Sequence, residues 1–341
     1  MNAVIAGLVL GLIFGAAARS GRFCLLRGMK GLVGRGDLSP LRAFALAIAV
    51  AILATQILAL TGGTNLAGSL PMRPRFSWMA MLAGGAIFGL GMVMANACGA
   101  RSVVLAAGGN LRSGLVLVSL ALAAQASLTG VLQPLRNAVQ AMGVVEPSRL
   151  SLIDVFAGFG RWPAMLLAIG LPVGLLIWLA LPLIRNRRAE AAMAVIIGLV
   201  IAAGWWVSFV TDDPFDPKVL TSLSYVGPMG EGLLWLILST GRELSFGVAA
   251  VAGTALGALV VAVLSSDFRL ESIGSTGRAM QAIAGGVLMG FGGVLALGCS
   301  IGQGISGTST LSLASLVAFS GILAGIVIGL VLIRSPDKET P

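Results

Sequence analysis

The chain has 341 residues, of which 57% are hydrophobic and only 10% are charged, and its mean hydropathy is +1.00. This composition excludes an ordinary soluble globular domain and indicates an integral membrane protein. The net charge of +9 is compatible with nucleic-acid binding. However, the basic residues lie in short loops between apolar stretches, which is typical of membrane topology, so we expect contact with a lipid bilayer and not with nucleic acid.

Apolar stretches of membrane-spanning length recur along the whole chain. Since a bilayer core about 30 Å thick needs about 20 apolar residues per helix, the sequence predicts an all-α integral membrane protein with about nine transmembrane helices. The first stretch has no Lys or Arg before it, and eight more follow, so we expect a retained helix and not a cleaved signal peptide. The predicted helices lie near 3–18, 41–62, 77–96, 113–133, 163–184, 192–210, 243–264, 279–298 and 311–333.

The placement of charge predicts the orientation. With the N-terminus outside and the C-terminus in the cytoplasm, the inner loops hold most of the 22 Lys and Arg residues, as the positive-inside rule requires. The same orientation leaves the acidic connection TDDPFDPK (211–218) outside. It also places Trp side chains at outer helix ends, where aromatic anchors are preferred, namely Trp78, Trp162, Trp205 and Trp206.

The cysteine pattern excludes most metal chemistry. Cys24, Cys98 and Cys299 are widely separated, and the chain has no histidine. A zinc, haem or histidine-based catalytic site is therefore not expected, and neither is any cofactor. Because the number of cysteines is odd, at least one thiol lacks a partner within the chain.

Shifting the sequence by 201 residues exposes an internal repeat. It places GGAIFGLGMVMANAC (84–98) over GGVLMGFGGVLALGC (285–299), with seven of fifteen positions identical, including the cysteines. We interpret residues 1–341 as a single membrane domain made by duplication, with repeat one at 1–135, a linker helix at 160–190 and repeat two at 191–335. Four spans and one linker span reverse the second repeat. Two inverted, pseudo-symmetric repeats are therefore predicted, an architecture typical of transporters.

The segments after the two matched cysteines turn polar and small. They are GARSVVLAAGGNLRSG (99–114) and SIGQGISGTSTLS (300–312). Polar backbone at membrane depth is tolerated only when it is buried in protein or lines a watery cavity, so we expect short re-entrant helices that bring the thiols to a shared path. The alternative places both segments at the membrane surface. The counterpart of the Cys24 segment lies near TSLSYVGPMGEG (221–232), which has no cysteine.

Two further patterns bear on mechanism. GQGISG (302–307) matches a dinucleotide-binding pattern, but it follows a membrane helix and not a short strand, so we discount it. No Asp or Glu lies inside a predicted span except Glu243 at a helix start, whereas proton-coupled transporters usually keep such groups there. The driving force is then the substrate gradient, an ion held by neutral ligands, or consumption of the product.

At this point the cysteine motifs resemble those of a known family. SGRFCLLRG around Cys24, NACGARSVVLAAGGNLRS around Cys98 and LGCSIGQGISGTSTLSLAS around Cys299 are similar to the three motifs of the YeeE/YedE family of bacterial inner-membrane sulfur transporters. The resemblance covers essentially the whole chain. This sequence has Gln303 where histidine is common in the family.

The resemblance implies a transporter and not an enzyme. It implies import of thiosulfate from the periplasm to the cytoplasm through an hourglass-shaped protein, with thiol hydrogen bonds to the ion at a central constriction. A small cytoplasmic sulfur carrier of the TusA-like type is an expected partner, and the location is the bacterial inner membrane. The candidate binding and translocation residues are Cys24, Cys98, Cys299, Gly99, Arg101, Asn110, Ser300, Gln303 and Ser309.

The residues suit this role physically. Thiols donate hydrogen bonds only while protonated, and the scarcity of charge near Cys98 and Cys299 favours that form. We expect helix N-termini at Asn110–Ser113 and Thr308–Ser312 to add backbone donors for an anion. Two alternatives stay open, namely transport of another sulfur or selenium species and a membrane thiol enzyme that forms a persulfide for a sulfur carrier.

Overall fold

The computed structural model describes residues 2–34, 36–212 and 219–333, and nine helical segments within them are long and apolar enough to cross a membrane. The prediction of an all-α integral membrane protein is confirmed. Most of the predicted acidic connection falls at 213–218 and lies outside the described residues. The same is true of residues 334–341, which include the last two positions of repeat two.

The long helices begin and end close to the predicted positions when α9, η3 and α10 are taken together as the linker helix. The largest differences are at Thr129, predicted at 133, and at Arg188, predicted at 192. The long helices are α1 (Ala3–Ser20), α3 (Ser39–Leu60), α4 (Trp78–Ala95), α6 (Leu111–Thr129), α10 (Leu171–Asn186), α11 (Arg188–Val210), α13 (Phe246–Leu264), α14 (Thr276–Leu295) and α15 (Leu313–Leu332).

Shorter elements connect these helices. The short helices are α2 (Leu25–Val33), α5 (Gly99–Ala107), α7 (Gln133–Gln140), α8 (Leu152–Ala157), α9 (Arg161–Met165) and α12 (Val226–Ile237). Single turns are the 3-10 turns η1 (Leu66–Gly68) and η2 (Leu70–Met72) and the π-helical turns η3 (Leu166–Gly170) and η4 (Gly302–Gly307). Strands β1 (Phe76–Ser77) and β2 (Val144–Val145) form an antiparallel pair.

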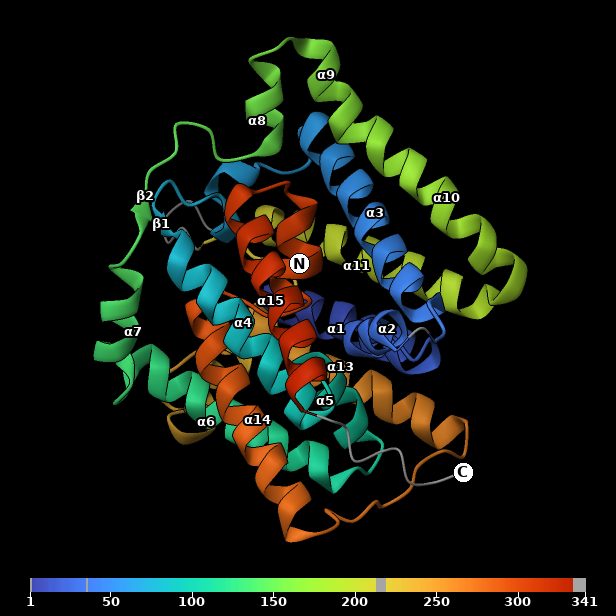
Figure 1. The fold of residues 1–341 in the computed structure, drawn as a ribbon, viewed down its shortest axis with the longest axis vertical. Coiled ribbons are helices and arrows are strands. Elements are labelled where there is room, and N and C mark those ends of the chain that lie inside the picture. The colour runs from blue at the N-terminus through green and yellow to red at the C-terminus, as the bar shows by residue number, and fades with distance from the viewer. Residues whose placement is uncertain (1, 35, 213–218, 334–341) are drawn as a thin grey trace.

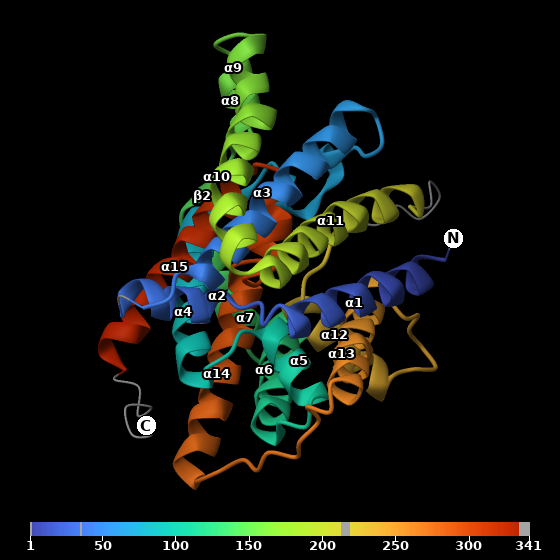
Figure 2. The same ribbon diagram turned by 90° about the vertical axis from the view of Figure 1, so that its right-hand side faces the viewer.

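The helices run between two faces of the bundle. We call the face at which α1 begins the N-face and the opposite face, toward which α15 runs, the C-face (Figure 2). α1 and α13 run parallel, since Gly7 packs on Phe246 and Gly15 on Thr254. A Cβ on Gly15 would lie 2.1 Å from the backbone oxygen of Thr254, so the two backbones touch, as small residues allow in membrane bundles.

α4 and α14 cross antiparallel and in direct contact (Figure 1). Gly84 faces Gly292 and Gly91 faces Gly285. A Cβ on Gly292 would lie 2.7 Å from the Gly84 oxygen, and a Cβ on Gly91 would lie 2.7 Å from the Gly285 oxygen. The 201-residue shift aligns Gly84 with Gly285 and Gly91 with Gly292. Each of the two α4 glycines therefore contacts the α14 glycine that is aligned with the other α4 glycine.

Contacts between the two halves of the chain occur in matching pairs. α1 packs on α13 as α3 packs on α11, and α4 packs on α15 as α6 packs on α14. In the predicted duplication α1 corresponds to α11, α3 to α13, α4 to α14 and α6 to α15. Neither half packs only on itself, and the linker helix α10 packs mainly on α3. The inverted relation of the repeats stays a prediction that this pairing supports.

The polar segments after Cys98 and Cys299 are tied to opposite faces. The Gly109 oxygen accepts from the Glu271 amide at 3.0 Å, in the α13–α14 connection on the C-face. The Leu311 oxygen accepts from the Leu152 amide at 2.9 Å, at the start of α8 on the N-face. Backbone groups that leave their helices at membrane depth are thereby satisfied within the protein.

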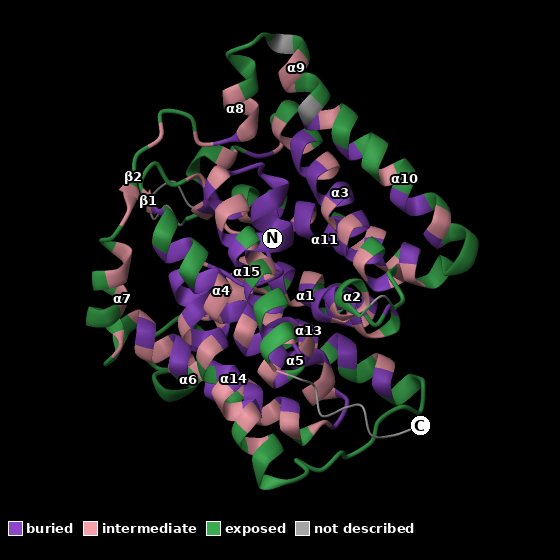
Figure 3. Cartoon of the chain, in the orientation of Figure 1, coloured by how far each residue is buried: buried purple, intermediate pink, exposed green. Residues whose placement is uncertain are grey.

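Burial follows the bundle. Figure 3 shows buried residues gathered in the interior and exposed ones along α10, α7 and the connections. The exposed side chains of α10 are large and apolar, for example Leu171 at 50% and Trp178 at 70% exposure. Such a surface suits lipid, because the hydrocarbon core of a bilayer is itself apolar.

The α4–α14 contact predicts a sharp cost for one methyl group. In Gly292→Ala the new Cβ meets the backbone of Gly84 and Phe88, which cannot swing away as a side chain can. We expect a loss of about 1–3 kcal/mol of unfolding free energy, measured by thermal unfolding in detergent. Gly174→Ala on α10 is the matched control, since a Cβ there meets nothing within 4 Å. Equal unfolding temperatures for the two variants would contradict the close contact.

Candidate functional site

All three cysteines are free, buried and placed just before a short helix. Cys24 precedes α2, Cys98 precedes α5 and Cys299 comes shortly before η4. The Cys98 sulfur accepts a hydrogen bond from the Arg101 amide at 3.4 Å, and the Cys299 sulfur accepts one from the Gly302 amide at 3.3 Å. The two matched thiols therefore cap their helices in the same way, at the end where the helix dipole favours negative charge.

Each of the two matched cysteines follows a left-handed residue that ends the preceding long helix. Asn96 (φ 59°) ends α4 and Leu297 (φ 56°) follows α14. Asparagine tolerates this conformation, whereas a leucine there costs about 1–2 kcal/mol. Gln303 holds the second turn, since its Nε2 donates to the oxygens of Ala296 at 2.9 Å and Leu297 at 3.0 Å. Backbone strain of this kind persists where the surrounding contacts enforce it.

A fourth residue completes this set, and sequence reasoning missed it. Tyr225 lies 201 residues after Cys24 and immediately precedes α12. Its side chain is 1% exposed, its hydroxyl is 2.9 Å from Thr254 Oγ1, and its ring centroid is 5.5 Å from that of Phe14. The shift that aligns Cys98 with Cys299 also aligns Cys24 with Tyr225, so the signal was present in the sequence.

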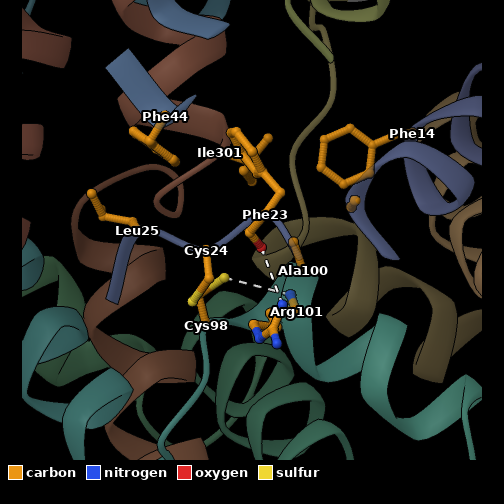
Figure 4. A pocket seen from close by; sticks show the side chains of 10 residues that line it. Phe14, Phe23, Cys24, Leu25, Phe44, Cys98, Ala100, Arg101 and Ile301 are labelled. Atoms are coloured by element: carbon orange, nitrogen blue, oxygen red, sulfur yellow. Dashed lines mark hydrogen bonds between the residues drawn. The ribbon is translucent and has the colours of Figure 1, made fainter. Parts of the chain in front are cut away.

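Cys24 and Cys98 line a central cavity together (Figure 4). The volume that the centre of a water molecule can occupy is about 10 Å³, roughly the space that a single water needs. The constriction is therefore closed to an ion of several heavy atoms. The remaining walls are mostly apolar and come from Phe14, Ala18, Phe23, Leu25, Phe44, Ala100, Arg101 and Ile301.

Arg101 is the only charged side chain of this cavity among the described residues. Its Nη1 donates to the Phe23 oxygen at 3.4 Å, and its amide caps Cys98 (Figure 4). Further cations lie nearby in the chain, since Lys30 donates to Asn96 Oδ1 at 2.7 Å and Arg19 pairs with Asp267 at 3.2 Å. Both helices that carry them, α1 and α2, approach the C-face, so positive charge lies on that side of the thiols.

Ser300 is a hydroxyl without a fixed partner at the thiols. It is 1% exposed, contacts the Cys98 thiol, and makes no hydrogen bond of standard geometry with the described residues. A buried polar group left unpaired is costly, and such a group at a binding site is available to a ligand. Gly99 follows Cys98 and begins α5, and a Cβ on Gly99 would meet Leu120 at 3.3 Å.

The other predicted site residues lie further away. Ser309 is fully buried behind η4, where its hydroxyl accepts from Trp205 Nε1 at 3.1 Å and its carbonyl accepts from Gln56 at 2.9 Å. Asn110 caps α6 through the Ser113 amide at 2.8 Å and donates to Glu271 on the C-face. The structure therefore does not bring Asn110 to the cavity. The helix starts at the thiols belong to α2, α5 and η4, and not to α6 and α15.

Metal binding is not indicated. No group of three or more Cys, Asp or Glu side chains within the described ranges is arranged to hold a metal ion. The site instead offers thiols, a hydroxyl and backbone amides, which suit a polarizable anion and are poor ligands for a hard cation.

A bundle of membrane-spanning helices that closes around unpaired thiols defines a polytopic membrane protein with a central constriction. Comparison with known proteins places it further: the model of the sulphur transport family matches residues 20–328, and the chain belongs to this family. The resemblance to YeeE/YedE proteins is thereby confirmed.

Two curated relatives are similar over nearly their full length. The chain is 28% identical to "Thiosulfate transporter TsuA" of Escherichia coli (strain K12), over 95% of this chain and 92% of the relative. It is 25% identical to the protein of the same name from Spirochaeta thermophila, over 92% and 93%. Family and relatives are named as transporters, in agreement with the expectation that the chain is not an enzyme.

Two serines of the same segment should respond oppositely to removal of their hydroxyls. Ser300→Ala deletes a hydroxyl that touches the Cys98 thiol but makes no hydrogen bond of standard geometry with the described residues, so we expect an unchanged or slightly higher unfolding temperature. Ser306→Ala strips the Leu223 oxygen of a buried donor at 2.7 Å and should cost about 1–3 kcal/mol. Thermal unfolding of both variants in detergent measures this. A destabilised Ser300→Ala protein would show that its hydroxyl is already engaged.

Proposed function

We propose that the chain imports thiosulfate from the periplasm to the cytoplasm and that the ion passes by way of Cys98, Cys299 and Cys24. The observation that carries the proposal is the arrangement of three free, buried thiols, each just before a short helix, of which Cys24 and Cys98 line a cavity with room for about one water. The names of the two relatives support thiosulfate as the cargo.

The chemistry of the site favours passage over capture. Thiosulfate is a dianion with a soft terminal sulfur, and a neutral S–H group offers it a weak, reversible hydrogen bond. Conduction requires binding strong enough to admit the ion and weak enough to release it. Arg101 lies at one side of the thiols, and the helix starts of α5 and η4 add only partial positive charge. The Ser300 hydroxyl, beside the Cys98 thiol, is a further donor for a sulfonate oxygen.

In the closed state, aromatic side chains largely exclude water from the path between transport events. Phe14, Phe23 and Phe44 surround the thiols, and Phe23 and Phe44 stack with ring centroids 5.2 Å apart. Hydrophobic constrictions of this kind gate by excluding water. Because the cavity holds about one water, passage of thiosulfate requires these rings to move aside. The two inverted repeats give this movement a natural hinge, with the constriction at the repeat interface.

The same proposal covers topology and partner. The protein lies in the bacterial inner membrane with the N-face toward the periplasm and the C-face toward the cytoplasm, as the loop charges favour. Arg19, Lys30 and Arg101 then receive the ion on the inner side. A TusA-like sulfur carrier that takes up the product at the C-face would keep the inward gradient steep, which supplies a driving force without carboxylates inside the spans.

Loss of one thiol tests the relay. Cys98→Ala removes the donor at the centre while leaving a small apolar side chain, so we expect uptake to fall about tenfold. Uptake of radiolabelled thiosulfate into proteoliposomes measures this, with Ser320→Ala on the exposed side of α15 as the control. Normal uptake by Cys98→Ala at equal expression contradicts the relay.

The same preparation separates the alternatives. A persistent persulfide or thiosulfonate adduct, seen by intact-protein mass spectrometry after exposure to thiosulfate, would favour the persulfide route. Stronger competition by a selenium or another sulfur species than by thiosulfate itself would change the cargo and leave the path in place.

The orientation has a direct test. A maleimide that cannot cross membranes should label a cysteine introduced at Arg242, before α13 on the N-face, in intact spheroplasts. A cysteine introduced at Leu270, between α13 and α14 on the C-face, should be labelled only after the membrane is opened. Both side chains are exposed. The reverse pattern would show that the N-face is cytoplasmic.

A further inference from the structure

We propose that the N-face carries a second anion site, separate from the thiols, which takes a small divalent oxyanion such as thiosulfate before it reaches the constriction. The site is a pocket between the connection before α4, helix α7 with β2, and the end of α14. Its role in uptake rests on the proposed function, whereas its ability to bind an anion does not.

The pocket is the larger of the two described cavities. The centre of a water molecule can occupy about 220 Å³ in it, against about 10 Å³ at the thiols. No lining residue is shared between the two. The polar lining residues are Arg73, Arg75, Ser77 and Gln140, and the apolar ones include Phe76, Met81, Leu295 and Leu297.

The charged lining residues of this pocket are arginines, and their side chains are largely available to bind an anion. Among the described residues Arg73 has no ion pair. Arg75 pairs with Glu146 at 3.3 Å, but their side chains are 71% and 66% exposed, so the pair is weak and screened. Two guanidinium groups with free donors match the oxygens of a sulfonate, which they bind with charge-assisted, bidentate hydrogen bonds.

The start of α4 adds to this field independently of the arginines. Ser77 caps the 18-residue helix by accepting from the Ala80 amide at 3.1 Å, and both residues line the pocket. The positive end of the helix dipole thus faces the same volume as the guanidinium groups. Gln140, at the end of α7, adds an amide group to the lining of the pocket.

The floor of the pocket is the turn that carries a thiol. Leu295 ends α14, and Leu297 is the left-handed residue two positions before Cys299. Gln303 binds the oxygens of Ala296 and Leu297, which ties the floor to η4. An anion in the pocket therefore sits one turn of chain away from the path, on the side from which uptake would begin.

Equilibrium binding to the full-length protein tests the site. The protein is placed in nanodiscs of phosphatidylcholine alone, so that no anionic headgroup competes, and radiolabelled thiosulfate binding is measured at low and high salt. We expect the Arg73→Gln, Arg75→Gln double variant to lose at least about tenfold in affinity, with a weaker salt dependence. The control Arg242→Gln, exposed on the same face outside the pocket, should change it less than about twofold.

We expect a second variant to gain affinity for thiosulfate. Glu146→Gln releases Arg75 from its only ion pair in the described part of the chain, so thiosulfate should bind more tightly than to the unmodified protein. Unchanged affinity in both the double variant and Glu146→Gln overturns the proposal, and so does an equal loss in Arg242→Gln. Binding of phosphatidylglycerol that depends on Arg73 and Arg75, with no thiosulfate binding, overturns it in favour of a lipid site.

The proposed thiol path and the proposed second anion site can be tested independently of each other. Cys98→Ala should keep the binding that depends on Arg73 and Arg75, and the double variant should raise the KM for uptake while leaving the maximal rate unchanged. If the unmodified protein shows no uptake but binds thiosulfate through the two arginines, the proposed function fails and the site stands. If uptake is normal and its KM is insensitive to the arginines, the site fails and the function stands.

Discussion

The antiparallel contact of α4 with α14 is the constraint on which the rest of the structure depends. At Gly84, Gly91, Gly285 and Gly292 the two backbones touch, and no side chain fits between them. Both helices end at their left-handed residues next to this crossing, so the cysteines that follow start at the centre of the bundle. Helices separated by ordinary side chains would stand 8–10 Å apart, and the turns that carry Cys98 and Cys299 would lie farther from each other.

Charge is distributed unevenly between the centre of the bundle and its two faces. The centre holds thiols, aromatic rings, one hydroxyl and a single arginine, Arg101, while Arg19, Arg73 and Arg75 lie toward the two faces. An anion is therefore attracted at the surface and held mainly by weak donors in the middle. Further fixed cations beside Arg101 at the constriction would deepen the central energy well, and release would become the slow step. The sparing use of charge is thus a requirement of passage.

Much of this arrangement is predictable from the sequence because its signals are local or repeated. Span lengths depend on continuous apolar stretches, and the structure agrees with all nine within a few residues. The glycine register and the pairing of Cys98 with Cys299 follow from a shift of 201 residues. The same shift identifies Tyr225 as the counterpart of Cys24, but a tyrosine at a cysteine position carries no chemical signal, so the sequence placed only the counterpart segment, near 221–232, and not this residue.

Asn110 is a residue whose partner and location could not be predicted from the sequence. A polar residue near a helix start resembles an anion donor in the sequence, yet the partner that holds it, Glu271, is 161 positions away and lies on the C-face. The sequence by itself determined the class of protein, the number of spans, the repeat and the three thiols, because each depends on hydropathy or on residue identity. Only the tertiary structure decided which helix starts meet at the thiols, that the constriction is closed, and that Arg73 and Arg75 share a pocket with the turn before Cys299. Those features depend on contacts between the two halves of the chain, which no local pattern encodes.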